Sequence, residues 1–254
     1  MQAPVDLSVQ GEVLVITVNR PEVRNAIDAS TSLALAAAVD TLEGDESLRV
    51  GVLTGAGGVF SSGGDLDAFD RGEGPYVDGR GFAGMAERLP TKPLVAAIEG
   101  YALAGGLELA LCCDVLVAGR SARLGIPEVR HGLLAADGGL LRLRERLPFQ
   151  LAMMLALTGD DILAERAQQV GLVSEVVDDG AALAASIALA ERIAANAPLA
   201  VLASKEILRV ASDWPVSEAF QRQAAITGPV LASDDAREGV AAFAQRRHPR
   251  WTGR

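Results

Sequence analysis

The sequence predicts an α/β fold that ends in a largely helical region. Short β-branched runs alternate with Ala- and Leu-rich helical patterns over about the first 190 residues, an alternation typical of α/β domains rather than of sandwiches or bundles. The runs are mostly apolar along their whole length, as expected of strands covered on both faces. From about Gly138 onward, helical patterns follow one another with little strand between them.

Individual elements follow from these patterns. Strands are predicted at residues 13–18, 50–54, 94–98, 115–118 and 173–177. Asp28 is placed to cap a helix that runs to about Leu42 and ends at Gly44 and Asp45. Later helices are predicted at residues 138–147, 149–157, 164–170, 181–196, 198–211, 215–231 and 234–246, with prolines near the starts of three of them. We divide the chain into an α/β core, residues 1–190, and a C-terminal helical region, residues 191–254.

Composition excludes several classes of protein. The chain has 254 residues, half of them hydrophobic, and 23 basic against 33 acidic side chains give a net charge of −10. A chain of this length buries roughly 70–75% of its unfolded surface and needs no disulfides. The negative charge disfavours broad contact with nucleic acid or anionic lipid. Cys112 and Cys113 are adjacent in an apolar stretch, so we expect core residues rather than a disulfide framework or a CxxC metal site.

No segment has the pattern of a secretory signal or a membrane span. The N-terminal MQAPVDLSVQ has neither a basic nor an apolar signal region. The most apolar window, residues 101–119, is interrupted by Glu108 and Asp114 and falls short of the roughly 18–20 apolar residues that a span requires. The two histidines, His131 and His248, lie far apart, which argues against a His-rich metal centre. We expect a cytoplasmic protein with no membrane span and no metal.

Residues 68–89 form a glycine-rich segment of different character. Glycines and a proline stand among charged residues, at Gly72, Gly74, Pro75, Gly79, Gly81 and Gly84. This composition predicts a flexible surface excursion, and long loops of this kind often cover a site. The alternative is an insertion that covers no functional site.

Two glycine turns could each direct a backbone N–H at a ligand. FSSGGDL, residues 60–66, follows a predicted strand, and its paired glycines allow the backbone to approach a ligand closely. In GYALAGGLELAL, residues 100–111, Gly105 and Gly106 lead into a helical pattern, so their N–H groups would lie at a helix N-terminus, which favours negative charge. Each segment taken alone also fits an ordinary turn or helix start.

Two glutamates accompany these turns. Glu108 stands among apolar neighbours, where a charge is costly unless paired or needed, although a first-turn helix acid is the simpler interpretation. Glu128 follows a proline in LGIPEVRHGL, residues 124–133, where Arg130 could pair with it on the surface. Taken together, two N–H donors could stabilise a thioester enolate, at roughly 3–4 kcal/mol per donor. Two carboxylates could divide proton donation and water activation.

Five segments in order resemble those of the crotonase, or enoyl-CoA hydratase/isomerase, superfamily. They are NRPEVRNAI (19–27), FSSGGDL (60–66), GYALAGGLELALCCD (100–114), GIPEVRHGL (125–133) and EGVAAFAQRRHPRWTG (238–253). The resemblance covers essentially the whole chain. It implies a spiral of ββα units whose helical C-terminal region mediates trimerisation, in a homotrimer or a hexamer built as a dimer of trimers.

The resemblance also implies an activity. An enoyl-CoA hydratase adds water syn to a trans-2-enoyl-CoA and gives a 3-hydroxyacyl-CoA, a step of fatty acid metabolism such as β-oxidation. Gly64 and Gly105 would then form the oxyanion hole, Glu128 would protonate the α-carbon, and Glu108 would orient and deprotonate the water. No metal, nucleotide or redox cofactor is implied, because coenzyme A is part of the substrate. Contacts to the acyl-CoA would come from Val23, Arg24, Ser62, Asp65 and Leu66, with Arg24 on a phosphate.

Several alternatives stay open. Double-bond isomerases of the superfamily commonly keep only the later glutamate, so two glutamates favour a hydratase over an enoyl-CoA isomerase. A carnitinyl-CoA-type dehydratase could use the same two glutamates, and a non-catalytic acyl-CoA binding protein would need neither. A serine hydrolase acting through Ser61 or Ser62 would lack the G-x-S-x-G elbow.

Three further features bear on the substrate. Asp137 stands in a segment that is often glycine-rich in the family, where it could raise a glutamate pKa or point away from the site. Gly64 replaces a more usual alanine or methionine, which would widen the acyl pocket. A basic C-terminal cluster could meet the phosphates of coenzyme A from the same or a neighbouring subunit, through Arg246, Arg247, Arg250 and Arg254.

Overall fold

A six-stranded sheet forms the centre of the computed structural model, which describes residues 3–254. Its strands are, in order across the sheet, β1 (Val5–Gln10), β2 (Val13–Val18), β3 (Val50–Gly55), β6 (Leu94–Ile98), β8 (Val115–Gly119) and β11 (Glu175–Val177). β1 is antiparallel to β2, and the other neighbours are parallel. The five predicted strands are confirmed to within two residues. β1 was not predicted, because this edge strand alternates polar residues with the exposed Leu7 and Val9 and so contains no apolar run.

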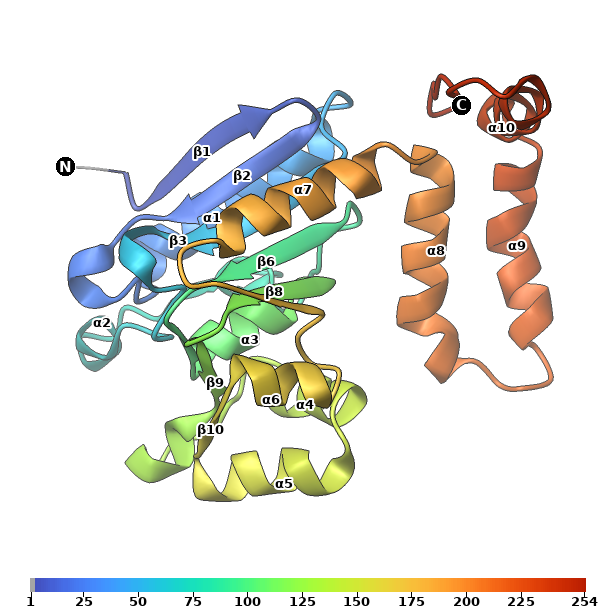
Figure 1. Ribbon diagram of the computed structural model, residues 1–254. Helices are drawn as coiled ribbons and strands as arrows, with labels where there is room; N and C mark the ends of the chain where they lie inside the picture. The colour runs from blue at the N-terminus through green and yellow to red at the C-terminus, as the bar shows by residue number, and fades with distance from the viewer. Residues whose placement is uncertain (1–2) are drawn as a thin grey trace.

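Helices cover both faces of this sheet (Figure 1). Val13 and Val15 point to one face, where α7 (Ala182–Ala194) packs, and Leu14 and Ile16 point to the other, into the main core. The main core includes α1 (Ala29–Gly44), which begins where Asp28 accepts a hydrogen bond from the Thr31 N–H, as predicted. Burial on both faces explains why the strands are continuously apolar.

A second, three-stranded sheet turns the chain into a spiral. It contains β7 (Tyr101–Leu103), β9 (Arg123–Gly125) and β10 (Asp161–Leu163), and Ser61 extends it by a parallel bridge to Ala102. Three times the chain runs from the large sheet to the small one and into a helical segment: α2 (Leu66–Asp70), α3 (Gly105–Leu111) and the 3-10 helix Pro127–His131. The ends of β7, β9 and the extended segment at Ser61 therefore lie side by side, and the predicted functional residues follow them.

The prediction of a surface excursion at residues 68–89 is wrong for its second half. After α2, a short hairpin of β4 (Tyr76–Val77) and β5 (Gly81–Phe82) returns the chain to the main core, where Phe82 and Met85 are fully buried. The hairpin is tied to α1, because the Ser32 hydroxyl donates to Pro75 O at 2.8 Å. The glycines of this segment obscured its short apolar run.

The remaining helices form two groups in Figure 1: α4 (Gly139–Arg146), α5 (Phe149–Thr158) and α6 (Ala164–Gln169) lie beside the small sheet, while α8 (Pro198–Val210), α9 (Ala219–Leu231) and α10 (Asp234–Gln245) stand apart. The helix predicted to start at residue 215 begins at Ala219, because Pro215–Glu218 form a turn. The predicted division at residue 190 falls within α7 and stays a prediction. Cys112 and Cys113 are free and buried, as predicted.

Within residues 3–254, no single helix is long and apolar enough to cross a membrane. By length and composition alone, α7 and residues 198–213 would pass that test together, but they are bent by 109°. Residues 1–2 of the N-terminal segment, for which no secretory signal was predicted, lie outside the described residues.

Candidate active site

A cavity of about 500 Å³ opens where β7, β9 and the extended segment at Ser61 end. It brings together seven of the nine residues that the sequence singled out: Ser62, Gly64, Asp65, Leu66, Gly105, Glu108 and Glu128. Val23 and Arg24 do not line it, although Arg24 O accepts a hydrogen bond from the Ser62 N–H at 3.0 Å. The rest of the lining comes from Phe69, Pro75, Tyr76, Phe82, Leu103, Ala104, Pro127, His131, Gly132, Leu133, Leu134, Ala136 and Asp137.

The N–H of Gly64 is directed away from the Ile27 segment, with which Gly64 forms an isolated bridge. Ile27 N donates to Gly63 O at 2.8 Å and Asp65 N donates to Ile27 O at 2.9 Å, so the peptide groups flanking Gly64 bond on the Ile27 side. The Gly64 N–H must then point the other way, as in any extended segment. It donates to no acceptor within residues 3–254. A Cβ on Gly64 would lie 4.0 Å from Pro75, so an alanine would fit.

The N–H of Gly105 begins α3 beside Gly64. Ala104 precedes it with a φ of 52°, a left-handed conformation rare outside glycine, and is held there by its N–H bond to Gly125 O at 3.0 Å. A Cβ on Gly105 would lie 3.3 Å from Gly64 N and 2.7 Å from Phe82 Cζ. Gly64 and Gly105 are therefore close neighbours, and the contact with Phe82 explains why residue 105 is a glycine.

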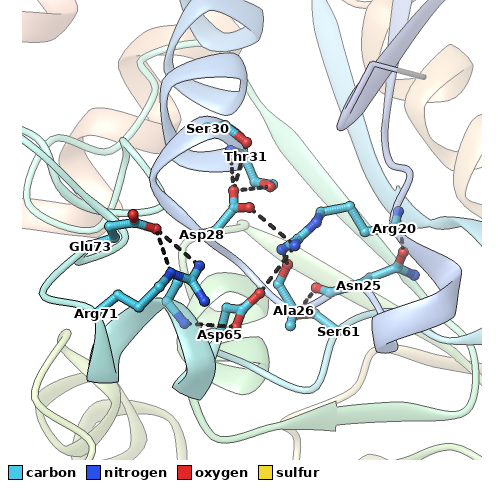
Figure 2. Close-up of polar contacts among 11 residues, drawn as sticks. Arg20, Asn25, Ala26, Asp28, Ser30, Thr31, Ser61, Asp65, Arg71 and Glu73 are labelled. Carbon is cyan, nitrogen blue, oxygen red and sulfur yellow. Dashed lines mark hydrogen bonds and ion pairs between the residues drawn. The ribbon is translucent and has the colours of Figure 1, made fainter. Parts of the chain in front are cut away.

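Polar contacts from residues 20–28 fix the segment that contains Gly64 (Figure 2). The Arg20 guanidinium pairs with Asp28 and Asp65, each at 3.1 Å. The Ser61 hydroxyl, fully buried, donates to Asn25 O at 2.8 Å. Ser61 is thus a structural residue and unavailable as a nucleophile. The Asp65 carboxyl is also engaged, since it caps α2, and the Asp65 backbone N–H and C=O are bonded to Ile27 O and to the Phe69 N–H. Arg20 belongs to the segment 19–27 that resembles the crotonase family, but the sequence did not predict its ion pairs with Asp28 and Asp65.

Glu108 is a buried carboxyl with one oxygen fixed. Its Oε1 accepts hydrogen bonds from the N–H groups of Asp137 and Gly139, both at 2.8 Å. Its pKa is raised to about 7, mainly by burial and also by the nearby Asp137 and Glu128 charges, against the effect of these two bonds. Its Oε2 accepts no hydrogen bond within residues 3–254. The carboxyl lines the cavity, so Oε2 is the oxygen left for a substrate or water.

The raised pKa of Glu108 predicts a pH-dependent loss of stability. A carboxyl with a folded pKa of about 7 and an ordinary value of 4.5 binds more protons in the native state between these pH values, so stability falls as pH rises through this window. Glu108→Gln keeps an acceptor for the two N–H groups and cannot ionise. We expect its free energy of unfolding to exceed the wild type's by up to about 3 kcal/mol at pH 8, and to differ little at pH 5. Urea unfolding at both pH values measures this, and parallel pH dependences of the two proteins would contradict it.

Glu128 is a carboxyl whose oxygens are buried without a donor. Both of its oxygens lack a hydrogen-bond partner within residues 3–254. Burial raises its pKa, and so does the Asp137 charge. Arg130, the surface partner considered above, pairs with Asp160 instead. Because nothing donates to it, its neutral, protonated form is favoured.

Asp137 points into the site rather than away. Asp137 lines the cavity together with Tyr76, toward which its carboxyl is directed, and burial raises the pKa of that carboxyl. The Tyr76 hydroxyl lies 3.5 Å from Asp137 Oδ2, and the Tyr76 and Phe82 rings contact each other edge to face at 6.4 Å between centroids. The sequence indicated neither aromatic residue, since both lie in the glycine-rich segment.

The basic C-terminal cluster does not line the cavity. Arg247 pairs with Glu238 at 2.5 Å, and α10 stands far from α3 in Figure 1. In the part of the chain that the structure describes, no group of three or more His, Cys, Asp or Glu side chains is arranged to hold a metal ion.

An α/β spiral with two buried carboxyls beside paired backbone donors defines a class of protein, and comparisons identify it. Residues 8–254 match the enoyl-CoA hydratase/isomerase family. The chain belongs to this family, also called the crotonase family, and has its fold.

Individual relatives divide between two activities. A solved enoyl-CoA hydratase of Mycobacterium tuberculosis H37Rv is 54% identical, with a TM-score of 0.98 and full coverage of both chains. The enoyl-CoA hydratase EchA19 of the same species is 40% identical over 252 residues, 96% of this chain and 95% of the relative. The carnitinyl-CoA dehydratase of Salmonella enteritidis is also 40% identical, over the whole of both chains.

Proposed function

We propose that this protein is an enoyl-CoA hydratase, a hydro-lyase that converts trans-2-enoyl-CoA and water into 3-hydroxyacyl-CoA in fatty acid or acyl-CoA metabolism. The observation that carries the proposal is the pair of buried carboxyls, Glu108 and Glu128, on one cavity beside the N–H groups of Gly64 and Gly105. The family supplies the thioester class, and the hydratase relatives support the reaction.

The two backbone donors stabilise the charge that forms during the reaction. The thioester oxygen lies between the N–H groups of Gly64 and Gly105. Addition of water at the β-carbon places negative charge on that oxygen, and fixed donors stabilise it without reorganisation, at roughly 3–4 kcal/mol each. No further protein group is needed at the oxygen.

The two carboxyls supply and accept one proton each. Ionised Glu108 takes a proton from the attacking water through Oε2, while its Oε1 stays fixed by two N–H donors. Neutral Glu128 gives its proton to the α-carbon, so one hydroxyl and one hydrogen add to the double bond. The pair ends with its single proton on Glu108, and exchange through solvent returns it to Glu128. The pair must therefore hold one proton in total.

Carnitinyl-CoA dehydration is the second candidate, because that relative is as similar to this chain as EchA19 is. Dehydration is the same reaction in reverse and uses the same carboxyls. A double-bond isomerase is disfavoured because Glu108 would have no part in it. A non-catalytic binder would retain two buried carboxyls at a cost in stability and without a use.

Loss of the enoyl-thioester ultraviolet absorbance tests the proposal. We expect the wild type to consume a short and a long trans-2-enoyl-CoA, and Glu108→Gln to lose hydration while retaining double-bond migration. Asp67, exposed on α2 and outside the cavity lining, offers Asp67→Asn as a matched control that should keep full activity. Consumption of neither thioester by the wild type would contradict the hydratase and favour the binder.

Assembly and coenzyme A binding belong to the same proposal. α8 to α10 stand apart from the sheets and leave large apolar side chains exposed, among them Leu208, Phe220 and Phe243. We propose that neighbouring subunits cover them in a homotrimer or a dimer of trimers. Val23 and Arg24 contact coenzyme A outside the cavity, with Arg24 on a phosphate, and the C-terminal arginines meet phosphates only from a neighbouring subunit.

A further inference from the structure

The Glu128 carboxyl must regain a proton after each turnover of the proposed reaction. Both of its oxygens are buried and have no hydrogen-bond partner within residues 3–254, so solvent does not reach them directly. Glu108 ends the reaction with the proton, and its Oε1 is held by two backbone N–H groups. A side chain that borders both solvent and Glu128 would supply the missing step.

The 3-10 helix Pro127–His131 presents its side chains in three directions. Such a helix has three residues per turn, so side chains at positions i and i+3 lie one above the other. Pro127 and Arg130 form one such pair beside Gly159, where an added Cβ would lie 3.2 Å from Pro127 Cα and 3.0 Å from Arg130 Cγ. Val129 faces a different way and lines an apolar cavity with side chains of α4 and α5.

Glu128 and His131 form the second i, i+3 pair, and they share the face that borders the active-site cavity. Both line that cavity, whereas Val129 and Arg130 between them do not. Glu128 is partly buried, while His131 is exposed at the end of the helix, where Gly132 turns the chain with a φ of 72°. The imidazole therefore borders solvent on one side and the Glu128 side chain on the other.

Imidazole has the chemistry that this step requires. It is the side chain that most readily takes up and releases a proton near neutral pH, and its two nitrogens can accept on one side and donate on the other. The other titratable side chains of the described lining, Asp65, Tyr76, Glu108 and Asp137, have different partners or roles. Asp65 pairs with Arg20, Asp137 accepts from the Tyr76 hydroxyl, and Glu108 is the group that must lose its proton.

We propose that His131 is the proton relay of this site and returns a proton from solvent to Glu128 after each turnover. The inference rests on the proposed function for the role of Glu128 as proton donor. One ring nitrogen takes a proton from solvent while the other gives its proton to the Glu128 carboxylate, so the ring stays neutral. Glu108 gives the proton of the attacking water to solvent, which restores the proton content of the enzyme. His131 acts through Glu128 and does not contact the reacting carbons.

The first turnover and later turnovers should respond differently to His131→Asn. The first hydration uses the proton already on Glu128, so excess enzyme mixed rapidly with a trans-2-enoyl-CoA should react at the wild-type rate. Steady-state kcat depends on the return of the proton and should fall by about 10²-fold, the lower end of what a positioned proton-transfer group contributes. An unchanged kcat, or an equal loss in the first turnover, would overturn the inference.

Added imidazole and the second histidine complete this test. Free imidazole should restore much of the kcat of His131→Asn, because it can carry the proton in place of the missing ring, whereas a merely structural defect would not respond. His248 is the other histidine of the chain, exposed and outside the cavity lining. His248→Asn should keep the wild-type kcat with and without imidazole. A His131→Asn variant that imidazole does not restore would also count against the relay.

Deuterium exchange separates the inference from the proposed hydration. Butanoyl-CoA has no double bond to hydrate, but a Glu128 carboxylate can remove a proton from its α-carbon and return one. In D₂O, deuterium enters the α-carbon only if the proton on Glu128 exchanges with solvent before it is returned. We expect the wild type to incorporate deuterium, His131→Asn to do so about 10²-fold more slowly, and imidazole to restore the rate.

The two proposals fail in different ways in these experiments. If the wild type incorporates deuterium through His131 but hydrates no enoyl-CoA, the inference holds and the hydratase proposal fails. If the wild type hydrates enoyl-CoA but His131→Asn exchanges deuterium as fast as the wild type, the hydratase proposal stands and the relay is refuted. A wild type that incorporates no deuterium would refute the relay whatever its hydration activity.

Discussion

Glu128→Gln is expected to lower kcat for hydration by about 10²- to 10⁴-fold, with little change in KM. Glutamine keeps the size of the side chain but cannot give a proton to the α-carbon, and proton transfer by a positioned group typically contributes that much. Steady-state absorbance kinetics at saturating enoyl-CoA measure the loss. The variant should be at least as stable as the wild type, because the carboxyl oxygens of Glu128 have no hydrogen-bond partner within residues 3–254 that the substitution could remove.

Arg130 provides the control for this substitution. It lies two residues away and pairs with Asp160 rather than with Glu128, so Arg130→Gln should leave kcat within about threefold of the wild type. If Glu128→Gln lost less than tenfold in kcat, Glu128 would not be the proton donor.

Gly64→Pro is expected to lower kcat by about 10²- to 10³-fold, the usual cost of one oxyanion donor. Proline removes the backbone N–H and adds side-chain carbons. Gly64→Ala adds a carbon and keeps the N–H, and the 4.0 Å to Pro75 leaves room for it. Comparison of the two variants separates the donor from the added bulk.

A folding measurement accompanies this comparison. The Gly64 N–H makes no hydrogen bond within residues 3–254, so its removal breaks no internal contact of the described chain. Thermal unfolding should show both variants folded. Equal kcat values for Gly64→Pro and Gly64→Ala would show that this N–H does not contact the thioester oxygen.

The large sheet could be predicted because each of its central strands is a buried apolar run. β6 is fully buried, and its bounds match the prediction to the residue. The spiral could not be predicted, because its second sheet uses strands of three residues, Tyr101–Leu103 and Arg123–Gly125, and a single bridge at Ser61. Backbone hydrogen bonds define these strands, and no side-chain pattern accompanies so short an element. The family resemblance supplied this part of the architecture.

The site divides in the same way. The two glycine turns, Glu108 and Glu128 could be located because each follows a strand or starts a helix, whereas the choice of Gly64 and Gly105 within the turns came from the family resemblance. The direction of Asp137 could not, since sequence separation from Glu108 does not reveal that its N–H holds that carboxylate at 2.8 Å. Tyr76 reaches the cavity through a hairpin that the glycine content of its segment concealed.

The most direct test of the central claim, that this protein adds water to an enoyl thioester, is a mass measurement in H₂¹⁸O. Incubation of the wild type with a trans-2-enoyl-CoA in labelled water should give a 3-hydroxyacyl-CoA that carries one ¹⁸O on its β-carbon. Mass spectrometry of the thioester should show this product with the wild type and a strongly reduced rate with Glu128→Gln. A thioester of unchanged mass, whether its double bond has moved or not, would contradict hydration.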